Sequence, residues 1–296
     1  MLEFEPVKID DVDWASQLLE NSGNSGCEFN FANNLAWSRT YNLKRCSFDG
    51  LYILSAGENE TLRFMLPVGN GDFKSAFSEM KKYSESFSKP LEIYGITDAT
   101  MPFVRAHFDD RFRVTEDRDS FDYIYLSEKM VSLSGKKLHS KRNHLKRFET
   151  NYDFSYNEIC ERDFDDCIAF AAQSYNENLS YDDESAVGEQ YAIHTYFEHF
   201  DRLKMHGGVL RIDGKVRAFT LGSAINTSVC DINIEKADRS FEGSYTAICN
   251  SFAKSYGCNF KYINREEDLG LEGLRKSKLS YCPEFLLKKY RVIIDG

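Results

Sequence analysis

The chain has 296 residues, a formal net charge of −10, and 42% hydrophobic and 14% aromatic residues. Its length suits two domains, and its hydrophobic content can fill a core for each of them. The acidic balance argues against a protein that coats nucleic acid over its whole surface, because such a protein would be basic.

We expect neither a signal peptide nor a membrane span, because the N-terminus is acidic and no apolar run approaches the length that crosses a bilayer. The chain has eight cysteines, and none of them forms a CxxC pair. These features predict a cytoplasmic protein with reduced thiols, most of them in the core, and no zinc or other metal site.

The first half of the chain alternates between helical and extended patterns. Helical spacing of apolar residues falls at residues 10–23, 30–42, 72–87 and 99–108. Alternating runs typical of strands fall at residues 50–57, 61–69, 90–96 and 111–126. The first two of these runs predict a hairpin.

The second half repeats this order of elements with an added strand. Strand patterns fall at residues 154–159, 208–225, 228–237, 260–264 and 284–294. The run 208–225 is a hairpin around Asp213-Gly214, a strong signal for a tight turn. Helical patterns fall at residues 163–178, 188–207, 243–257 and 271–279. We therefore predict two similar α/β domains, residues 1–134 and 135–296.

The segment between the two halves, residues 136–147, is strongly basic and has no acidic residue. On a helix, Leu138, Leu145 and Phe148 would lie on one side and dock on a domain. The outward cations would be Lys136, His139, Arg142, Lys146 and Arg147, while Lys137 and Lys141 would pack their stems along the apolar stripe. This predicts a contact surface for phosphate or another anionic ligand, and a solvated linker helix is the alternative.

A glycine-plus-serine entry to a helix, Gly243-Ser244, follows the strand of residues 228–237. Free backbone N–H groups at such a helix end bind phosphate well. An ordinary serine cap is the alternative interpretation.

Polar residues crowd residues 262–281. Asn264 and Arg265 end a strand, where open α/β sheets usually bind ligands. Asp268 either takes part in that site or caps the following turn. Arg275 and Lys278 either bind phosphate or pair with the neighbouring acids, and Tyr281 either serves the site or packs in the core.

The element order of the second half resembles the GCN5-related N-acetyltransferase (GNAT) fold, a mixed, mostly antiparallel sheet flanked by helices. The resemblance places a pantetheine–pyrophosphate arm against residues 231–237 and 239–245. The acetyl-CoA loop pattern Q/R-x-x-G-x-G/A is not matched, because "RSFEGSY" has one more residue before Gly243 and lacks the second glycine.

Three longer blocks, residues 122–149, 232–248 and 262–285, together resemble an uncharacterised bacterial family. That family is related to the C-terminal catalytic domain of phosphatidylglycerol lysyltransferases. Its members have two tandem GNAT-like domains, as do the Fem aminoacyltransferases. The resemblance implies an α/β (α+β) protein with two tandem GNAT-like domains.

The implied function is a soluble acyl- or aminoacyltransferase with CoA, acyl-CoA or aminoacyl-tRNA as donor. The acceptor would be a small molecule or lipid headgroup with an amine or hydroxyl. A non-catalytic binding protein, or a regulator that binds tRNA or a nucleotide, is the alternative.

The site residues expected for this function fall into three groups. The catalytic candidates are Asp231, Glu235, Asn264 and Tyr281. Candidates for cofactor contacts are Ile234, Lys236, Arg239, Gly243, Ser244 and Tyr245. Candidates for substrate or phosphate contacts are Lys137, Lys141, Arg142, Arg265, Asp268, Arg275 and Lys278.

Overall fold

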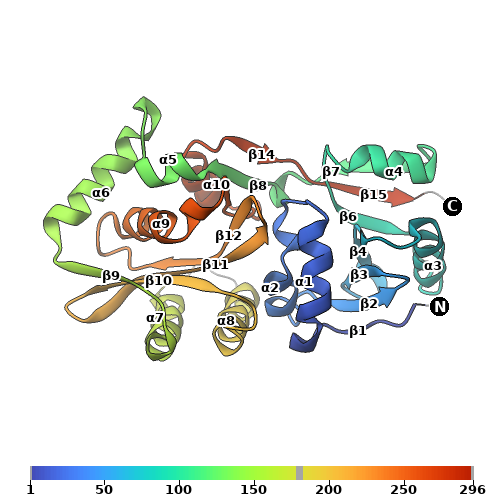
Figure 1. Cartoon of the computed structure of the whole chain (residues 1–296), viewed down its shortest axis with the longest axis horizontal. Helices are drawn as coiled ribbons and strands as arrows, with labels where there is room; N and C mark the ends of the chain where they lie inside the picture. The colour runs from blue at the N-terminus through green and yellow to red at the C-terminus, as the bar shows by residue number, and fades with distance from the viewer. Residues whose placement is uncertain (1, 178–182, 295–296) are drawn as a thin grey trace.

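The computed structural model describes residues 2–177 and 183–294, and its strands form two mixed sheets that lie end to end along the molecule (Figure 1). The first sheet has the order β1 (Glu5–Pro6), β2 (Lys44–Phe48), β3 (Leu51–Ala56), β4 (Arg63–Met65), β6 (Glu92–Ile96), β15 (Tyr290–Ile294) and β7 (Phe112–Glu116), with β5 (Val68–Gly69) beside β3. The second sheet has the order β14 (Phe285–Leu287), β8 (Asp122–Leu126), β13 (Tyr262–Asn264), β12 (Val229–Ala237), β11 (Lys215–Asn226), β10 (His206–Ile212) and β9 (Phe154–Glu158).

The two sheets exchange strands. The last strand of the chain, β15, lies in the first sheet between β6 and β7, and β8 lies in the second sheet between β13 and β14. Residues 111–126 and 284–294 were each predicted as one strand, but each run breaks in the middle and supplies one strand to each sheet. The sheets therefore do not follow the predicted division at residue 134 strictly.

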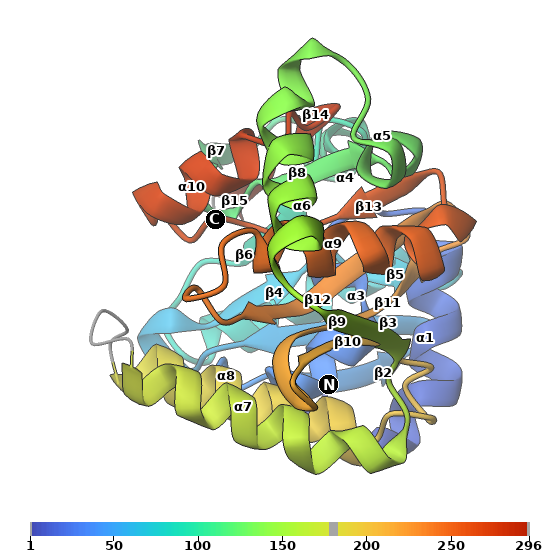
Figure 2. The same cartoon turned by 90° about the vertical axis from the view of Figure 1, so that its left-hand side faces the viewer.

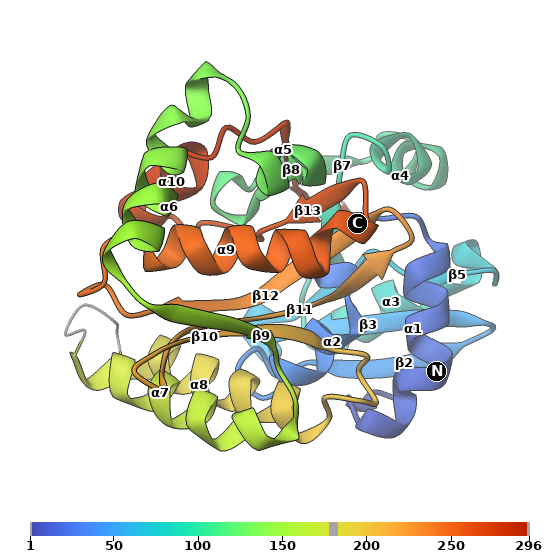
Figure 3. The same ribbon diagram turned by 60° about the vertical axis from the view of Figure 1, so that its left-hand side comes forward.

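Helices cover both sheets. Those of the first half are α1 (Val12–Asn21), α2 (Phe31–Ala36), α3 (Phe73–Glu85) and α4 (Met101–Phe108). The others are α5 (Ser127–Ser132), α6 (His139–Asn151), α7 (Phe164–Glu177), α8 (Asp183–Glu198), α9 (Ser244–Ser255) and α10 (Glu272–Leu279). Figure 3 shows α7 and α8 on one face of the second sheet and α9 on the other, while α1 and α2 lie at the junction of the two sheets.

The structure also differs from the prediction in two helices and one strand. Helix α2 ends at Ala36 instead of residue 42, and α8 ends at Glu198 because the chain then turns and enters β10 at His206. Strand β2 was not predicted. The last residue predicted for the helix of 163–178, Asn178, lies outside the described residues.

The strands β12 and β13 run parallel but pair only over three residues, from Val229–Tyr262 to Asp231–Asn264. Strand β12 continues beside β11 to Ala237, whereas β13 ends at Asn264. Beyond Asp231, one edge of β12 therefore has no strand partner among the described residues. We call this opening the splay.

A bulge sits at the start of the splay. The register between β11 and β12 shifts between Leu221 and Gly222, so that Asn233 has no partner of its own. A bulge re-aims the side chains that follow it. As a result, Asp231 points to the α2 and α8 side of the sheet, while Glu235 points to the α9 side, as their hydrogen-bond partners show.

Candidate functional site

Five acidic side chains gather where the two sheets meet, and we call them the central carboxylate cluster. They come from the loop before α2, from β8, from β12 and from the loop after β13, and they are Glu28, Asp122, Asp231, Glu266 and Glu267. Two buried lysines, Lys278 and Lys289, are the cations beside them. The cluster therefore holds more acids than counter-charges.

Asp231 lies at the centre of this cluster and is fully buried. Its Oδ2 accepts hydrogen bonds from Asn30 (3.1 Å), Asn33 (3.0 Å) and Asn233 (3.3 Å). Its Oδ1 is buried and accepts no hydrogen bond from the described residues. Burial, together with the nearby Asp122, raises the pKa of Asp231 well above its ordinary value. Such a carboxyl group is a candidate for proton transfer.

Glu266 shares a donor with Asp231, because the same Asn33 amide also donates to Glu266 at 2.8 Å. Burial and the charges of Asp231 and Glu267 raise the pKa of Glu266 well above its ordinary value. Tyr196 of α8 closes this side by donating its hydroxyl to Asn33 at 2.5 Å. The two acids and the amide between them form one hydrogen-bonded unit.

Lys289 lies on the other side of the cluster. Its ammonium contacts Asp122 (2.8 Å), Glu28 (2.7 Å) and the Cys27 thiol (3.4 Å). Burial alone would lower the pKa of Lys289, but these neighbours outweigh it and raise the pKa. The lysine sits between β14 and β15, at the point where the chain crosses from one sheet to the other.

Cys27, Asp122 and Glu267 place one ligand atom each within 4.8 Å of one another, a set that could hold a divalent cation. The Lys289 ammonium already lies against two of these three groups. Burial, together with Asp122 and Glu267, also raises the pKa of the Cys27 thiol, which opposes the thiolate form that metals prefer. The absence of a metal site stays a prediction.

The splay is filled from its α9 side by an ion pair. Arg265 Nη2 lies 2.7 Å from Glu235, and both side chains are only 9% exposed. The Arg265 guanidinium lies over the Tyr281 ring at 4.7 Å, and the Lys141 ammonium lies over the same ring at 3.9 Å. Arg265 Nη1 is buried and has no hydrogen-bond partner among the described residues. A donor for an anionic ligand is thus present at the splay.

Tyr281 is buried and donates its hydroxyl to Thr246 of α9 at 3.3 Å. Desolvation by burial raises the pKa of the Tyr281 hydroxyl far above its ordinary value. The four predicted catalytic residues therefore divide between two compartments. Asp231 and Asn264, which donates to Asp122 at 2.8 Å, lie in the central cluster, and Glu235 and Tyr281 lie on the α9 side.

The N-terminus of α9 is covered by α6. An added Cβ on Gly243, whose φ is +93°, would lie 2.5 Å from the backbone oxygen of His144. Ser244 is buried, and its hydroxyl donates to the backbone oxygen of Asp238 at 2.8 Å. Both residues therefore make close packing contacts at the helix end where phosphate binding was predicted.

The predicted polar residues of α10 and of the loop before it form hydrogen bonds and ion pairs within this segment and with its neighbours. Asp268, fully buried, accepts hydrogen bonds from Arg275 (2.8 and 2.9 Å), Arg118 (3.0 Å) and Tyr123 (2.5 Å). Burial alone would raise its pKa, but these donors hold it well below its ordinary value. Lys278 donates to the backbone oxygens of residues 265 and 267.

The remaining predicted residues lie apart from these clusters. Arg142 caps the backbone oxygens of residues 133 and 135, and Lys137 is exposed. Ile234 is in the core, Lys236 pairs with Glu189 of α8 at 2.6 Å, Tyr245 is half-buried, and Arg239 is exposed. Phe148 of α6 and Leu138, in the turn just before it, are buried, and Leu145 is half-buried, which confirms the predicted apolar side.

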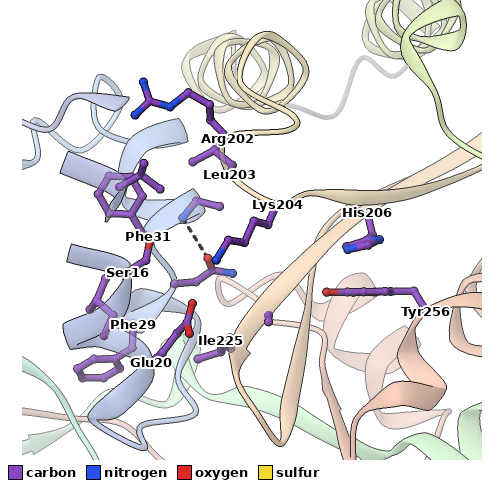
Figure 4. Close-up of a pocket in the computed structure, with 15 residues that line it drawn as sticks. Ser16, Glu20, Phe29, Phe31, Arg202, Leu203, Lys204, His206, Ile225 and Tyr256 are labelled. Carbon is purple, nitrogen blue, oxygen red and sulfur yellow. Dashed lines mark hydrogen bonds between the residues drawn. The ribbon is translucent and has the colours of Figure 1, made fainter. Parts of the chain in front are cut away.

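A cavity of about 170 Å³ lies between α1, the turn after α8, and β11 (Figure 4). Its lining includes the apolar side chains of Phe29, Phe31 and Ile225 together with the charged side chains of Glu20 and Lys204. Asn30 also lines it and donates to Asp231. Asn30 thus connects the cavity with the central carboxylate cluster.

Six side chains of the cluster and its neighbours come from the first half and from the link between β14 and β15, and none of them was predicted from the sequence. These are Cys27, Glu28, Asn30, Asn33, Asp122 and Lys289. Two features of the sequence could have indicated them. One is the asparagine-rich run "NFANN", and the other is the pair Lys288-Lys289 inside the predicted strand 284–294.

The two mixed sheets flanked by helices, with a parallel pair that splays, define a tandem GNAT-like protein. A tandem GNAT protein from the clavulanic acid biosynthesis pathway shares the arrangement at a TM-score of 0.53 and 9% identity, over 100% of this chain and 99% of that one. A model of the family described as "Phosphatidylglycerol lysyltransferase, C-terminal" matches residues 19–293. The chain belongs to this family, and the relationship supports a transferase-type function.

Solved structures extend the comparison. A conserved protein of unknown function from Bacteroides thetaiotaomicron is 33% identical over the whole of both chains, with a TM-score of 0.94. The structure of L-PGS from Bacillus licheniformis is 16% identical, with a TM-score of 0.65 over 98% of this chain and 92% of that one. This second likeness shows a shared fold.

An uncharacterised protein of Mycoplasmoides gallisepticum is 29% identical over 184 residues, 58% of this chain. The chain spans only 56% of that relative's length. Within the described residues, every helix is too short or too polar to cross a bilayer.

Proposed function

We propose that the chain transfers an aminoacyl group from aminoacyl-tRNA to an amine or hydroxyl acceptor, such as a small molecule or a lipid headgroup. The observation that carries this proposal is the central carboxylate cluster at the open end of the β12–β13 pair. Five carboxyl groups there face two lysines. An aminoacyl group brings the ammonium that such a site lacks, whereas a simple acyl group brings no charge.

The raised pKa values of Asp231 and Glu266 fit this role. Nearby positive charge favours the ionised form of a carboxyl group. An ammonium bound beside the Asn33 amide would ionise one or both acids and gain two charged partners. The free Oδ1 of Asp231 offers the first acceptor.

The splay supplies a route for the donor. Arg265 and Lys141, a residue of the basic helix α6, line its α9 side, and the carboxylate cluster lies on the other face of the sheet. The 3′ end of a tRNA would place its last phosphate near Arg265 Nη1. Its ester would then pass between β12 and β13 toward Asp231.

In the reaction, the acceptor nitrogen or oxygen attacks the ester carbonyl, and a new C–N or C–O bond forms. The bond between the carbonyl carbon and the ribose oxygen breaks. Asp231 takes the proton of the acceptor and then gives it to the ribose oxygen as that oxygen leaves, so the carboxylate is regenerated. Backbone N–H groups on the open edge of β12 would stabilise the oxyanion.

The covered N-terminus of α9 weighs against CoA as the donor. Gly243 packs against the backbone of α6, and the hydroxyl of Ser244 is already bonded within its own loop. A pyrophosphate would have to displace these contacts to use the N–H groups of the helix. A tRNA donor would place the reaction in the cytoplasm.

A non-catalytic binding protein is the second candidate. The Arg265–Glu235 pair favours it, because this pair fills the splay that a donor would enter. In the transferase, an incoming phosphate would draw Arg265 away from Glu235.

Equilibrium binding of aminoacyl-tRNA, deacylated tRNA and acetyl-CoA tests the proposal, with aminoacyl-ester turnover measured on the same samples. We expect aminoacyl-tRNA to bind most tightly and its ester to be consumed when an amine is supplied. Tight binding of acetyl-CoA, with no preference for charged tRNA, would refute it. Preferential binding without turnover would identify the non-catalytic protein.

A further inference from the structure

A second concave region lies far from the carboxylate cluster, at the end of the molecule that Figure 2 faces. It has a volume of about 470 Å³ and lies between α7, the tip of the β10–β11 hairpin, and the loop that follows β12. Its lining includes Asp166, Phe170, Lys215, Arg217, Asp238 and Arg239. These residues come from three separate elements.

The charge of this pocket is opposite to that of the chain as a whole. Four cations line it, Arg211, Lys215, Arg217 and Arg239, against two acids, Asp166 and Asp238. Arg211 is committed to acids, because it pairs with Asp163 (3.0 Å) and Asp166 (2.8 Å). Arg217 in turn pairs with Asp238, so the charges of Lys215 and Arg239 determine what the pocket attracts.

Arg217 is held in place but keeps a free donor. Its Nη1 lies 3.1 Å from Asp238, and its guanidinium lies 4.8 Å from the centre of the Phe241 ring. Its Nε is buried and has no hydrogen-bond partner among the described residues. A buried N–H without a partner is costly, so an acceptor that reaches it would gain binding energy.

Arg239 and Lys215 flank the pocket from the loop after β12 and from the hairpin tip, and both are exposed. Phe170, Val216 and Ala237 supply an apolar wall. Multiple cations around one free N–H are the arrangement that binds phosphate oxygens.

We infer that this pocket binds a phosphate group, carried by either a nucleotide or an RNA backbone. The basic helix α6 lies at the same end of the molecule, above the hairpin in Figure 2. An RNA could therefore contact α6 and the pocket together. The inference does not depend on the transfer reaction, because phosphate can bind here whether or not an aminoacyl group is transferred.

The test is titration calorimetry of the full chain at low salt. One arm uses inorganic pyrophosphate, and the other uses an RNA stem-loop that carries no aminoacyl group. The variant is Lys215→Gln with Arg239→Gln, which removes two exposed charges and leaves the Arg217–Asp238 pair intact. The matched control is Lys8→Gln with Arg111→Gln, which removes the same charge from exposed positions of the first half.

We expect the pocket variant to lose about tenfold or more in affinity, the size of one charged hydrogen bond, and the control to lose less than about twofold. Loss in both arms identifies phosphate as the shared ligand, and loss only with RNA assigns the site to a nucleic-acid backbone. The inference is overturned if neither probe binds, or if the pocket variant and the control bind equally well.

Discussion

The amide of Asn33 in α2 donates a hydrogen bond to Asp231 in β12 at 3.0 Å, across 198 residues of sequence. The same amide bonds Glu266 at 2.8 Å, so one side chain of the first half orders two acids of the second. The centre of the protein is therefore built by both halves, and neither half alone contains it.

Asp231→Asn should change how stability depends on pH. The pKa of Asp231 is raised in the folded chain, so the folded state keeps a proton that the unfolded state loses. The free energy of unfolding therefore falls as pH rises from the ordinary value toward the raised value. The variant lacks this titration and should lose less stability with rising pH.

Urea unfolding from about pH 4 to about pH 8 measures this difference. Asp153→Asn, at an exposed position, is the control and should follow the native curve. Parallel curves for the native chain and Asp231→Asn would contradict a buried, proton-retaining carboxyl.

Lys289→Met should destabilise the fold by about 3–5 kcal/mol, because removing one partner leaves Asp122 and Glu28 as buried, uncompensated acids. Lys288→Met is a matched control one residue away, where the lysine is half-exposed and lies 3.8 Å from Glu116. It should cost less than about 1 kcal/mol. Equal effects of the two substitutions in chemical denaturation would show that Lys289 does not hold the cluster.

Gly243→Ala should destabilise the junction of α6 and α9 by about 1–3 kcal/mol, because φ is +93° and the new Cβ would meet the His144 backbone oxygen. Gly273→Ala in α10 has open space around its Cβ and should instead stabilise the chain by about 0.5–1 kcal/mol. Thermal unfolding compares them. A neutral Gly243→Ala would mean that α6 does not pack on α9 as described.

Asp268→Asn should lower stability at neutral pH by about 1.5–3 kcal/mol, because the carboxylate is hydrogen-bonded by Arg275, Arg118 and Tyr123. The folded pKa is lowered, so this stabilisation is present above the ordinary pKa and is lost as pH falls through the lowered value. The gap between native chain and variant should therefore close in acid. Asp119→Asn, 61% exposed, should cost less than about 1 kcal/mol, and a similar cost for both would contradict the buried network.

Local patterns in the sequence predicted most elements of the second half. The Asp213-Gly214 turn is one example, since both residues have positive φ, as the hairpin signal requires. The buried Leu138 and Phe148 confirm the predicted inner side of α6. Such features depend on neighbours in sequence, which periodicity and turn chemistry report directly.

The exchange of strands could not be predicted, because each divided run keeps the alternating pattern of a single strand. Lys289 shows the consequence. In sequence it looks like a surface lysine on an edge strand, but the crossing between sheets carries it into the centre beside Asp122. The bulge at Asn233 likewise separates Asp231 from Glu235, which a regular strand would place on one face.

The central claim is that the carboxylate cluster recognises the ammonium of an aminoacyl group. The direct test is the affinity of the chain for aminoacyl-tRNA compared with the same tRNA after N-acetylation, which removes the charge and keeps the ester. We predict that the free ammonium form binds at least about tenfold more tightly, and that Asp231→Asn with Glu266→Gln abolishes this preference. Equal affinity of the native chain for both forms would contradict the account.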